Sequence, residues 1–207
     1  MIKNECYRKY SDMNLKSVFL FVFILAFSTA SLLAQVRSER EHRIRKSQFP
    51  EKAVLTLEEK VEDARQMRFY KEIDSNVVSY KAKFKKDRLR YGITFNSDSE
   101  VEVIEFEIKP VDIPNDSYTQ TIAYLEGNFE KYRVQKIQQQ YLTEDRDLDQ
   151  SLKNAFQNLM LPSITYKFTV KGKKGKATEK YETIFDAEGK LKLIKKALPP
   201  NYDHVLY

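Results

Sequence analysis

The sequence predicts an α+β fold of two repeated units, each a helix followed by an antiparallel β-meander, with a helical insertion in the second unit. Apolar residues recur at helical spacing over residues 54–64 and again over residues 118–132. After each of these stretches, apolar and polar residues alternate with a period of two, which is typical of antiparallel strands that bury one face. Turn-forming residues separate the alternating runs. Helices and antiparallel strands in this order are typical of the α+β class.

A secretory signal peptide is predicted over residues 1–34. Basic residues come first, a dense apolar run follows at residues 18–27, and small residues lead to Ala34. This order is typical of signal peptides. Cleavage after Ala34 is the preferred reading, and cleavage after Ala30 is the alternative.

The alternative for the whole segment is an uncleaved membrane anchor. A spanning helix needs about 20 apolar residues, whereas the dense apolar run covers only residues 18–27. The sequence therefore predicts export to the periplasm or the extracellular space, with membrane contact only through an uncleaved signal segment. Met1 and Met13 both remain open as the start, because a basic residue follows each of them before the apolar run.

Cleavage after Ala34 changes the composition of the chain that remains. It removes Cys6, the only cysteine, so neither a disulfide nor a thiolate site is expected in the mature protein. It also removes four basic and two acidic residues, which lowers the formal net charge from +6 to +4. Nucleic-acid-binding domains carry clustered basic surface. A net charge of +4 is only a mild excess of basic residues and does not predict a nucleic-acid partner.

The mature chain is predicted to divide into a charged tether, residues 35–48, and one folded domain, residues 49–207. Charged residues dominate the tether and apolar residues are scarce in it, so it is expected to stay solvated. Repeat one covers residues 49–114, and repeat two covers residues 115–200. A domain of this length can bury a core without disulfides.

In repeat one, the helix is predicted to begin near Pro50, because proline is tolerated in a first turn. The core stripe of this helix is Val54, Leu57, Val61 and Ala64. Residues 86–88 (KDR) form a predicted tight turn. A switch in apolar parity within residues 101–108 predicts either a β-bulge or a strand end that is covered on both faces. The predicted strands lie at residues 69–73, 78–84, 89–95 and 101–108.

In repeat two, Ser117 and Gln120 stand at the spacing of a capping box, which predicts the start of the second helix. The core stripe of this helix is Tyr118, Ile122, Leu125, Phe129 and Tyr132. Residues 144–161 are the predicted helical insertion, and residues 172–176 (GKKGK) are a basic turn. The predicted strands lie at residues 134–142, 164–170, 181–185 and 191–193.

The residues of both halves resemble one known group of proteins. The segments 69–72 (FYKE), 80–84 (YKAKF) and 185–190 (FDAEGK) resemble the beta-lactamase-inhibitor-like, PepSY-like family of secreted Bacteroidetes proteins. The resemblance covers about residues 49–198. It implies a PepSY-like or BLIP-like fold, and its motif consists of packing and turn positions that carry no chemistry. Members often have Trp near position 69 or 70, and this chain has none.

No catalytic residue, metal ligand or cofactor is predicted. The two histidines are His42, in the tether, and His204, in the C-terminal tail, so neither lies on a periodic element. Residues 172–176 have neither the spacing of a phosphate loop nor a helix after them. The dense carboxylate run at residues 98–107 is interpreted as a solvated strand face that pairs with neighbouring lysines.

The candidate binding residues are basic side chains at the polar positions of two predicted hairpins. Two basic sheet faces can dock an acidic protein or an acidic envelope component. The alternative is that these side chains only keep the sheet soluble and its edges unpaired. The candidates are Lys81, Lys83, Lys85 and Arg90 on the first hairpin and Lys167 and Lys171 on the second.

The sequence therefore predicts a secreted or periplasmic, non-enzymatic binding module, in its most specific form an inhibitor of an envelope or extracellular protein. The alternative is a small-ligand carrier with a pocket between the sheet and the helices, lined by Phe129, Phe156 and Leu159. An inhibitor is expected to present a wide polar sheet face, and a carrier is expected to enclose a cavity. An enzyme would need titratable groups that converge in a cleft.

Overall fold

A ten-stranded sheet is the frame of the protein in a computed structural model that describes residues 40–74, 77–143, 147–197 and 200–201. The strand order is β10-β1-β2-β3-β4-β5-β6-β7-β8-β9. The pairs from β1 to β9 are antiparallel, and β10 pairs parallel with β1. The strands are β1 (Arg40–Ile44), β2 (Arg65–Asp74), β3 (Val77–Lys86), β4 (Leu89–Phe95), β5 (Val101–Ile108), β6 (Lys131–Leu142), β7 (Thr165–Lys174), β8 (Ala177–Asp186), β9 (Leu191–Lys196) and β10 (Pro200–Asn201).

Helices interrupt the series of strands at a few points. The described helices are the 3-10 helices η2 (Lys46–Gln48) and η3 (Pro110–Asp112) and the α-helices α2 (Glu51–Lys60), α3 (Asn115–Asn128) and α4 (Leu148–Phe156). Helix α2 is followed by the four strands β2 to β5 and helix α3 by the four strands β6 to β9, with α4 between β6 and β7. The α+β class is thereby confirmed. The equivalence of the two halves as repeats stays a prediction.

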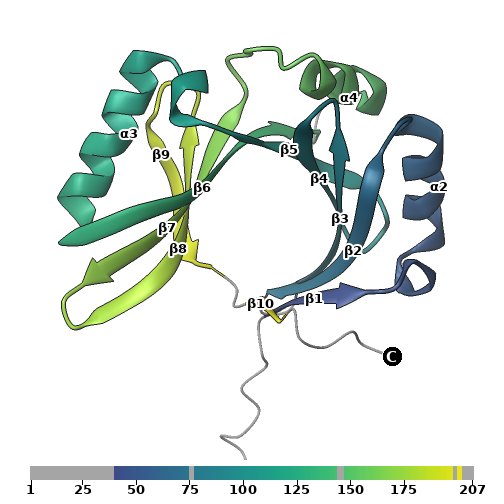
Figure 1. The fold of residues 1–207 in the computed structure, drawn as a ribbon, viewed down its shortest axis with the longest axis horizontal. Helices are drawn as coiled ribbons and strands as arrows, with labels where there is room; N and C mark the ends of the chain where they lie inside the picture. The colour runs from purple at the N-terminus through teal and green to yellow at the C-terminus, as the bar shows by residue number, and fades with distance from the viewer. Residues whose placement is uncertain (1–39, 75–76, 144–146, 198–199, 202–207) are drawn as a thin grey trace, which may run out of the picture. The chain divides into compact units, whose positions relative to one another are not determined.

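The sheet curls strongly, and the three α-helices lie on its outer, convex side (Figure 1). The curl brings distant strands together, because Nζ of Lys195 on β9 lies 2.8 Å from Oδ2 of Asp74 on β2. Strand twist and β-bulges both promote such curvature. Register shifts occur between β4 and β5 and between β6 and β7. The inner face of the sheet is therefore a concave surface that closes upon itself.

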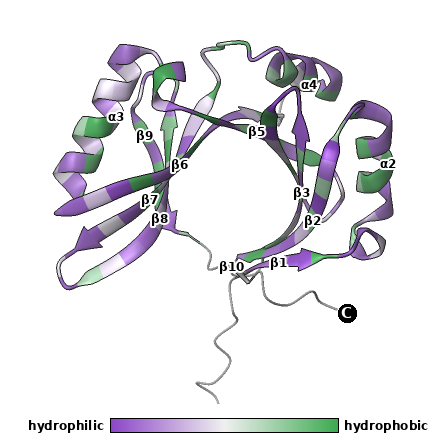
Figure 2. Ribbon diagram, viewed as in Figure 1, coloured by the Kyte–Doolittle hydropathy of each residue, from purple (hydrophilic) through white to green (hydrophobic). Residues whose placement is uncertain are grey.

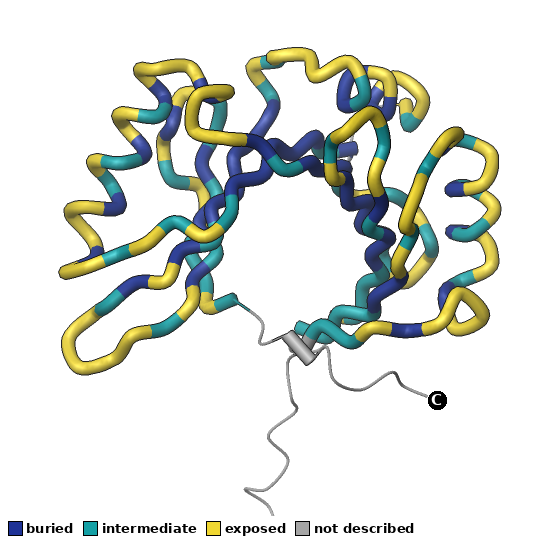
Figure 3. Tube along the Cα trace, viewed as in Figure 1, coloured by how far each residue is buried: buried dark blue, intermediate teal, exposed yellow. Residues whose placement is uncertain are grey.

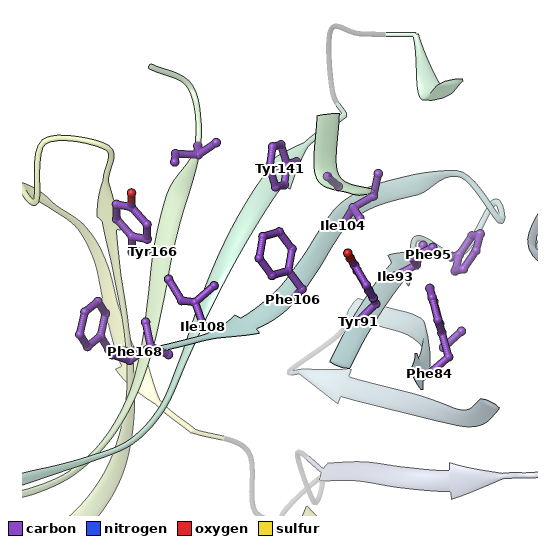
Figure 4. Close-up of a cluster of buried hydrophobic side chains, with 14 of the residues drawn as sticks. Phe84, Tyr91, Ile93, Phe95, Ile104, Phe106, Ile108, Tyr141, Tyr166 and Phe168 are labelled. Carbon is purple, nitrogen blue, oxygen red and sulfur yellow. The ribbon is translucent and has the colours of Figure 1, made fainter. Parts of the chain in front are cut away.

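The hydrophobic core lies between the convex face and the helices. The ring of Tyr91 on β4 lies 5.3 Å from that of Phe156 on α4, and the ring of Phe185 on β8 lies 5.6 Å from that of Tyr124 on α3. Figure 4 shows the centre of this core, including Phe106. Buried residues follow one another along the central strands (Figure 3). Hydrophobic residues alternate with hydrophilic ones along the same strands (Figure 2). The period-two pattern thus decides which face of each strand the helices cover.

Local sequence explains the tightest turns. Asp87 and Arg88 both have positive φ, 48° and 71°, as a two-residue hairpin turn with the twist of its strands requires. The predicted turn at residues 86–88 is confirmed. Gly189, in the turn from β8 to β9, has φ of 87°, and a Cβ there would overlap the backbone carbonyl of Ser117 on α3. This turn is therefore open only to glycine, and it fixes α3 against the sheet.

Several predicted elements agree with the structure. Helix α2 begins directly after Pro50, and α4 lies within the predicted helical stretch at residues 144–161. The bulge predicted from the parity switch of residues 101–108 is present, because the register between β4 and β5 shifts at Thr94. The predicted signal peptide, residues 1–34, and the first residues of the predicted tether lie outside the described residues.

The prediction of a solvated tether is wrong for residues 40–48. Residues 40–44 form strand β1, and Lys46–Gln48 form helix η2. Strand β1 pairs with β2, which places the buried side chain of Ile44 opposite Phe69. This charged segment is held by the buried side chain of Ile44 and by its pairing with the edge of β2, because the pairing satisfies the hydrogen bonds of its backbone N–H and C=O groups.

The predicted capping box of the second helix is also wrong. Helix α3 begins at Asn115 with Pro114 as its N-cap, three residues earlier than the N-cap expected at Ser117. Ser117 instead lies inside the helix, where its hydroxyl donates to the carbonyl of Ala187 at 2.7 Å. The serine thus joins α3 to the turn between β8 and β9.

Candidate functional site

The concave face of the sheet is polar, because the apolar positions of each strand face the helices. Its centre is the carboxylate of Glu105 on β5, which is 2 % exposed. Nζ of Lys167 on β7 lies 2.6 Å from one carboxylate oxygen of Glu105, and Nζ of Lys81 on β3 lies 3.3 Å from the other. Nε2 of Gln140 on β6 donates to Glu105 at 2.9 Å. Lys81 also contacts Glu72 on β2 at 3.1 Å.

We call these five residues, Glu72, Lys81, Glu105, Gln140 and Lys167, the Glu105 cluster. Strand pairing aligns its members, because Glu105 stands opposite Gln140 and also opposite Gly92. Gly92 leaves the space that the carboxylate occupies: a Cβ there would lie 3.1 Å from Oε1 of Glu105. The cluster therefore depends on a glycine in the neighbouring strand.

The charges in the cluster stabilise one another. Burial raises the pKa of Glu105, but the charges of Lys167, Lys81 and Lys136 outweigh this and hold the pKa well below its usual range. Burial likewise lowers the pKa of Lys81, but the charges of Glu105, Glu72 and Glu41 raise it above its ordinary value. The pKa of Glu72 is lowered because Lys81 outweighs its burial. All three groups stay ionised near neutral pH.

The cluster is therefore a structural feature. Two carboxylates face two ammonium groups, so its net charge is zero. A general acid or base needs a pKa near the working pH, and the pKa shifts of Glu72, Lys81 and Glu105 all lead away from it. The arrangement joins strands from β2 to β7 across the concave face.

A basic pocket of about 410 Å³ lies beside the cluster, at the end of the concave face toward the turn between β3 and β4. Five of its lining side chains are basic and two are acidic. Of the two acids, Glu105 already has its lysine partners, and Glu107 lies 3.6 Å from Arg90. The lining residues are Gln66, Arg68, Tyr70, Lys83, Phe84, Lys85, Arg90, Tyr91, Gly92, Glu105, Glu107, Lys136 and Gln138.

The basic residues of the pocket differ in their surroundings. Lys83 pairs with Glu41, and its Nζ lies 4.1 Å from the centre of the Tyr70 ring. Arg68, Lys85 and Arg90 are exposed at the rim. Among the described residues, neither Arg68 nor Lys85 forms an ion pair. The rim thus holds positive charge that the fold itself does not use.

Lys136 and Gln138 form the floor of the basic pocket. Both belong to β6 and face the concave side, where Gln138 stands opposite Glu107 and Lys167. Burial lowers the pKa of Lys136, and the charge of Glu105 acts against this.

The structure separates the six predicted binding residues into three groups. Lys83, Lys85 and Arg90 come together in the basic pocket. Lys171 is exposed on β7, opposite Lys180, and is not among the residues lining the pocket. Lys81 and Lys167, by contrast, are only 7 % and 8 % exposed and belong to the Glu105 cluster. The prediction that these two lie on a solvated face is wrong, because the curled sheet encloses that face.

The interpretation of the carboxylate run at residues 98–107 as a solvated strand face is wrong at Glu105 for the same reason. Glu100 and Glu102 are exposed, as expected, but Glu105 is buried in the cluster. Arg68, Lys136 and Gln138 also line the pocket, although their sequence positions did not predict it. A signal for the last two exists, because the apolar positions of β6 switch parity after Val134, where a bulge lies.

The aromatic residues predicted to line a carrier pocket lie in separate places. Phe129 packs against Tyr181, with ring centroids 5.1 Å apart, and Phe156 packs against Tyr91. Leu159 is 38 % exposed, and its carbonyl accepts from Tyr141. The described residues therefore do not bring these three side chains together around a cavity.

No group of three or more His, Cys, Asp or Glu side chains in the described ranges is placed to hold a metal ion. His42 lies on β1, and His204 lies outside the described residues. Within the part of the chain that the structure covers, no helix is both long and apolar enough to cross a bilayer.

Comparison with known proteins gave only structural likenesses. No family model and no curated protein matches the chain. A BLIP-like protein from Bacteroides fragilis has 15 % identity and a TM-score of 0.46, over 75 % of this chain and 91 % of its own. A DUF2874 family protein from Bacteroides ovatus has 11 % identity and a TM-score of 0.48, over 71 % of this chain and 86 % of its own.

A third solved structure, a candidate periplasmic protein from Bacteroides eggerthii, has 15 % identity and a TM-score of 0.48, over 72 % of this chain and 89 % of its own. The similar structures thus include a BLIP-like protein and a DUF2874 family protein from Bacteroides. The PepSY-like part of the resemblance stays a prediction. TM-scores of this size describe a partial likeness of fold, so the function is argued from the residues.

Proposed function

We propose that the protein is an exported, non-enzymatic binding module that uses the basic pocket and its rim to bind a negatively charged protein or envelope component. One observation carries the proposal: five basic side chains surround one pocket, and its deepest carboxylate is already paired with lysines of the fold. A fold gains nothing from leaving such charges together, because like charges repel. A negatively charged partner removes this repulsion.

The shape of the sheet decides how such a partner binds. The wide polar sheet face expected for an inhibitor is present as the concave face, but the buried side chains of the Glu105 cluster fill its centre. Arg68, Lys85 and Arg90 project at the rim instead. The partner therefore reaches the pocket with a narrow acidic segment. Inhibition of an envelope or extracellular protein is the most specific form of this proposal; the family resemblance implies only a structural likeness to inhibitor modules.

A small-ligand carrier is the second candidate. The volume of the basic pocket, about 410 Å³, lies within the range of about 300–1,000 Å³ that is usual for small-ligand sites. Its position on the concave face differs from the predicted position between sheet and helices. Charge complementarity makes the ligand an anion in this case too.

The test uses labelled poly-glutamate as the probe. We expect the purified protein to bind it at low ionic strength and more weakly at physiological ionic strength, because salt screens exposed charges. The triple variant Arg68→Glu, Lys85→Glu, Arg90→Glu should bind at least about tenfold more weakly, since each exposed pair contributes about 0.2–1 kcal/mol and each reversal adds repulsion.

The matched control is Lys131→Glu, Lys176→Glu, Lys192→Glu, three exposed lysines that do not line the basic pocket. Both variants change the net charge equally, so a difference between them isolates the pocket. Equal weakening by the two variants, measured by fluorescence anisotropy, would show that only net charge matters and would refute the proposed function.

A further inference from the structure

Three basic side chains form a row across the concave side of β6, β7 and β8, which lie side by side in one wall of the curled sheet (Figure 1). Strand pairing places Arg133 opposite Lys171, and Lys171 opposite Lys180. Lys171 has the same strand parity as Lys167 of the Glu105 cluster, so the row faces the concave side. All three side chains are exposed, and none of them lines the basic pocket. We call Arg133, Lys171 and Lys180 the basic row.

The fold does not compensate the charges of the basic row. Among the described residues, none of its three side chains forms an ion pair. Glu182 stands two positions after Lys180 on β8, but it lies opposite Lys195, on which its charge acts. Side chains directly opposite each other in neighbouring strands have Cβ atoms about 4.5–5.5 Å apart, and like charges there are destabilising. The basic row therefore lowers the stability of the sheet that carries it.

The positions on either side of the basic row are polar as well. On one side they are Lys131, Lys173 and Thr178, and on the other they are Lys136, Thr169 and Glu182. No aromatic or aliphatic side chain stands at these nine described positions. Protein partners usually bind through aromatic anchors, and single-stranded nucleic acids stack their bases on aromatic rings. This part of the face offers neither.

The geometry of the basic row favours a linear polymer. A flat membrane surface meets a curled sheet at its edges, whereas a single chain can follow the row along the concave side. Neighbouring strands lie about 4.7–4.9 Å apart, so the row presents one cation at each such step. An extended peptide repeats its side chains on one face only about every 6.4–6.8 Å. A polymer with an acidic group on every unit suits the row better.

We propose that the basic row is a second docking surface, which binds an acidic polysaccharide with a carboxylate on successive sugars. The three cations pair with carboxylates of the chain, which removes their mutual repulsion. The hydroxyls of Thr169 and Thr178, in the flanking positions, are hydrogen-bond partners for sugar hydroxyls. The basic row shares no residue with the pocket or its rim, so this surface goes beyond the proposed function.

The experiment is titration calorimetry of the purified protein with a hexamer of galacturonic acid, at constant moderate ionic strength. We expect the triple variant Arg133→Gln, Lys171→Gln, Lys180→Gln to bind the hexamer at least about tenfold more weakly, because three ion pairs are lost together. Monomeric galacturonic acid should bind far more weakly than the hexamer to the unchanged protein, because the units of one chain bind at high effective concentration.

The matched control is Lys52→Gln, Lys153→Gln, Lys192→Gln, which changes the net charge equally. These three lysines are exposed on α2, α4 and β9 and form no ion pair among the described residues. The control should weaken binding less than about threefold, because salt screens charges that lie away from the ligand. Equal weakening by the two variants would mean that only net charge matters and would overturn the docking surface.

Thermal denaturation gives a second readout. The basic-row variant should melt at the same temperature as the unchanged protein or higher, because it removes repulsion between opposed like charges. The hexamer should raise the melting temperature of the unchanged protein more than that of the variant, because only a bound ligand stabilises the fold. A lower melting temperature of the ligand-free variant would mean that these side chains support the fold, and the docking surface would be wrong.

The class of polymer is tested with hexamers of glutamate and of thymidylate under the same conditions. We expect the galacturonate hexamer to bind most tightly. Tighter binding of hexaglutamate would replace the polysaccharide by an acidic peptide, and tighter binding of hexathymidylate would replace it by a nucleic acid. Either result would overturn the assignment of the partner.

The proposed function and the docking surface fail separately. The rim variant Arg68→Glu, Lys85→Glu, Arg90→Glu should weaken hexagalacturonate binding less than the basic-row variant does. If it weakens this binding more, the polysaccharide lies in the basic pocket and the second surface is wrong, whereas the binding module stands. If the polysaccharide binds through the basic row but the rim variant leaves poly-glutamate binding unchanged, the second surface stands and the proposed function is wrong.

Discussion

At the scale of single residues, Glu105 determines the state of the concave face. Its carboxylate is the common partner of Lys81 and Lys167, which come from strands on either side of it in the sheet. Removing one member of a buried ion pair leaves the other charge without compensation, which costs more than the pair itself contributes. In this cluster a single substitution leaves the buried Lys167 in that condition and leaves Lys81 with Glu72 as its ion-pair partner.

We therefore expect Glu105→Gln to lower the free energy of unfolding by about 3–5 kcal/mol. Glutamine has nearly the same shape, so the loss reports the missing charge and not a cavity. The measurement is chemical denaturation followed by circular dichroism. Glu107→Gln is the control, since Glu107 lies on the same face of β5 but is paired only with exposed Arg90 at 3.6 Å, and it should cost less than about 1 kcal/mol. Similar losses in the two variants would contradict the structural role of the cluster.

At the scale of elements, the strands and turns follow from local sequence, whereas the burial of the polar face of each strand does not. The alternation of Tyr80, Ala82 and Phe84 with lysines predicts β3 and its apolar side correctly, because period two is a property of the strand itself. The burial of Lys81 could not be predicted in this way. Antiparallel sheets commonly leave one face in water, and nothing local shows that this sheet curls until its polar face is enclosed.

The residues of the candidate site also fall into those that local sequence predicts and those that it does not. Lys83, Lys85 and Arg90 could be named from the sequence because one hairpin brings them together. Lys136 comes from β6, and its side chain reaches the concave face only because the bulge after Val134 reverses the parity of the strand. Bulges and long-range strand order decide such contacts, and both depend on the whole sheet.

The contact between α3 and the turn from β8 to β9 gives a prediction at this scale. Gly189→Ala should destabilise the protein by about 2–4 kcal/mol, because a left-handed φ disfavours a side chain and the added Cβ overlaps the Ser117 carbonyl. Gly175→Ala is the control, since Gly175 also has a positive φ but has open space around it, and it should cost only about 1 kcal/mol. Thermal denaturation compares the two. Equal losses would mean that α3 is not held by this turn.

At the scale of the whole molecule, buried titratable groups limit the pH range in which the fold is stable. Buried charges lie on the concave face of the sheet, and buried tyrosines lie between its convex face and the helices. On the acid side, the pKa values of Glu105 and Glu72 are lowered by the lysines that outweigh their burial. A carboxyl with a lowered pKa in the folded state contributes stability above its unfolded pKa, about 4.3 for Glu. We therefore expect the free energy of unfolding to fall as the pH drops below that value, and to fall less steeply in Glu105→Gln.

On the alkaline side, burial raises the pKa of Tyr91, Tyr141 and Tyr166 to about 12. In the unfolded chain a tyrosine ionises near pH 10, so the folded state keeps its protons longer. The contribution of these tyrosines to stability is complete below about pH 10 and is lost as the pH rises toward 12, because ionisation there stabilises the unfolded state. Tyrosinate absorbance, recorded together with circular dichroism, checks this. If the tyrosines ionise near pH 10 while the fold persists, then these side chains are open to water, and the core between the convex face and the helices is looser than described.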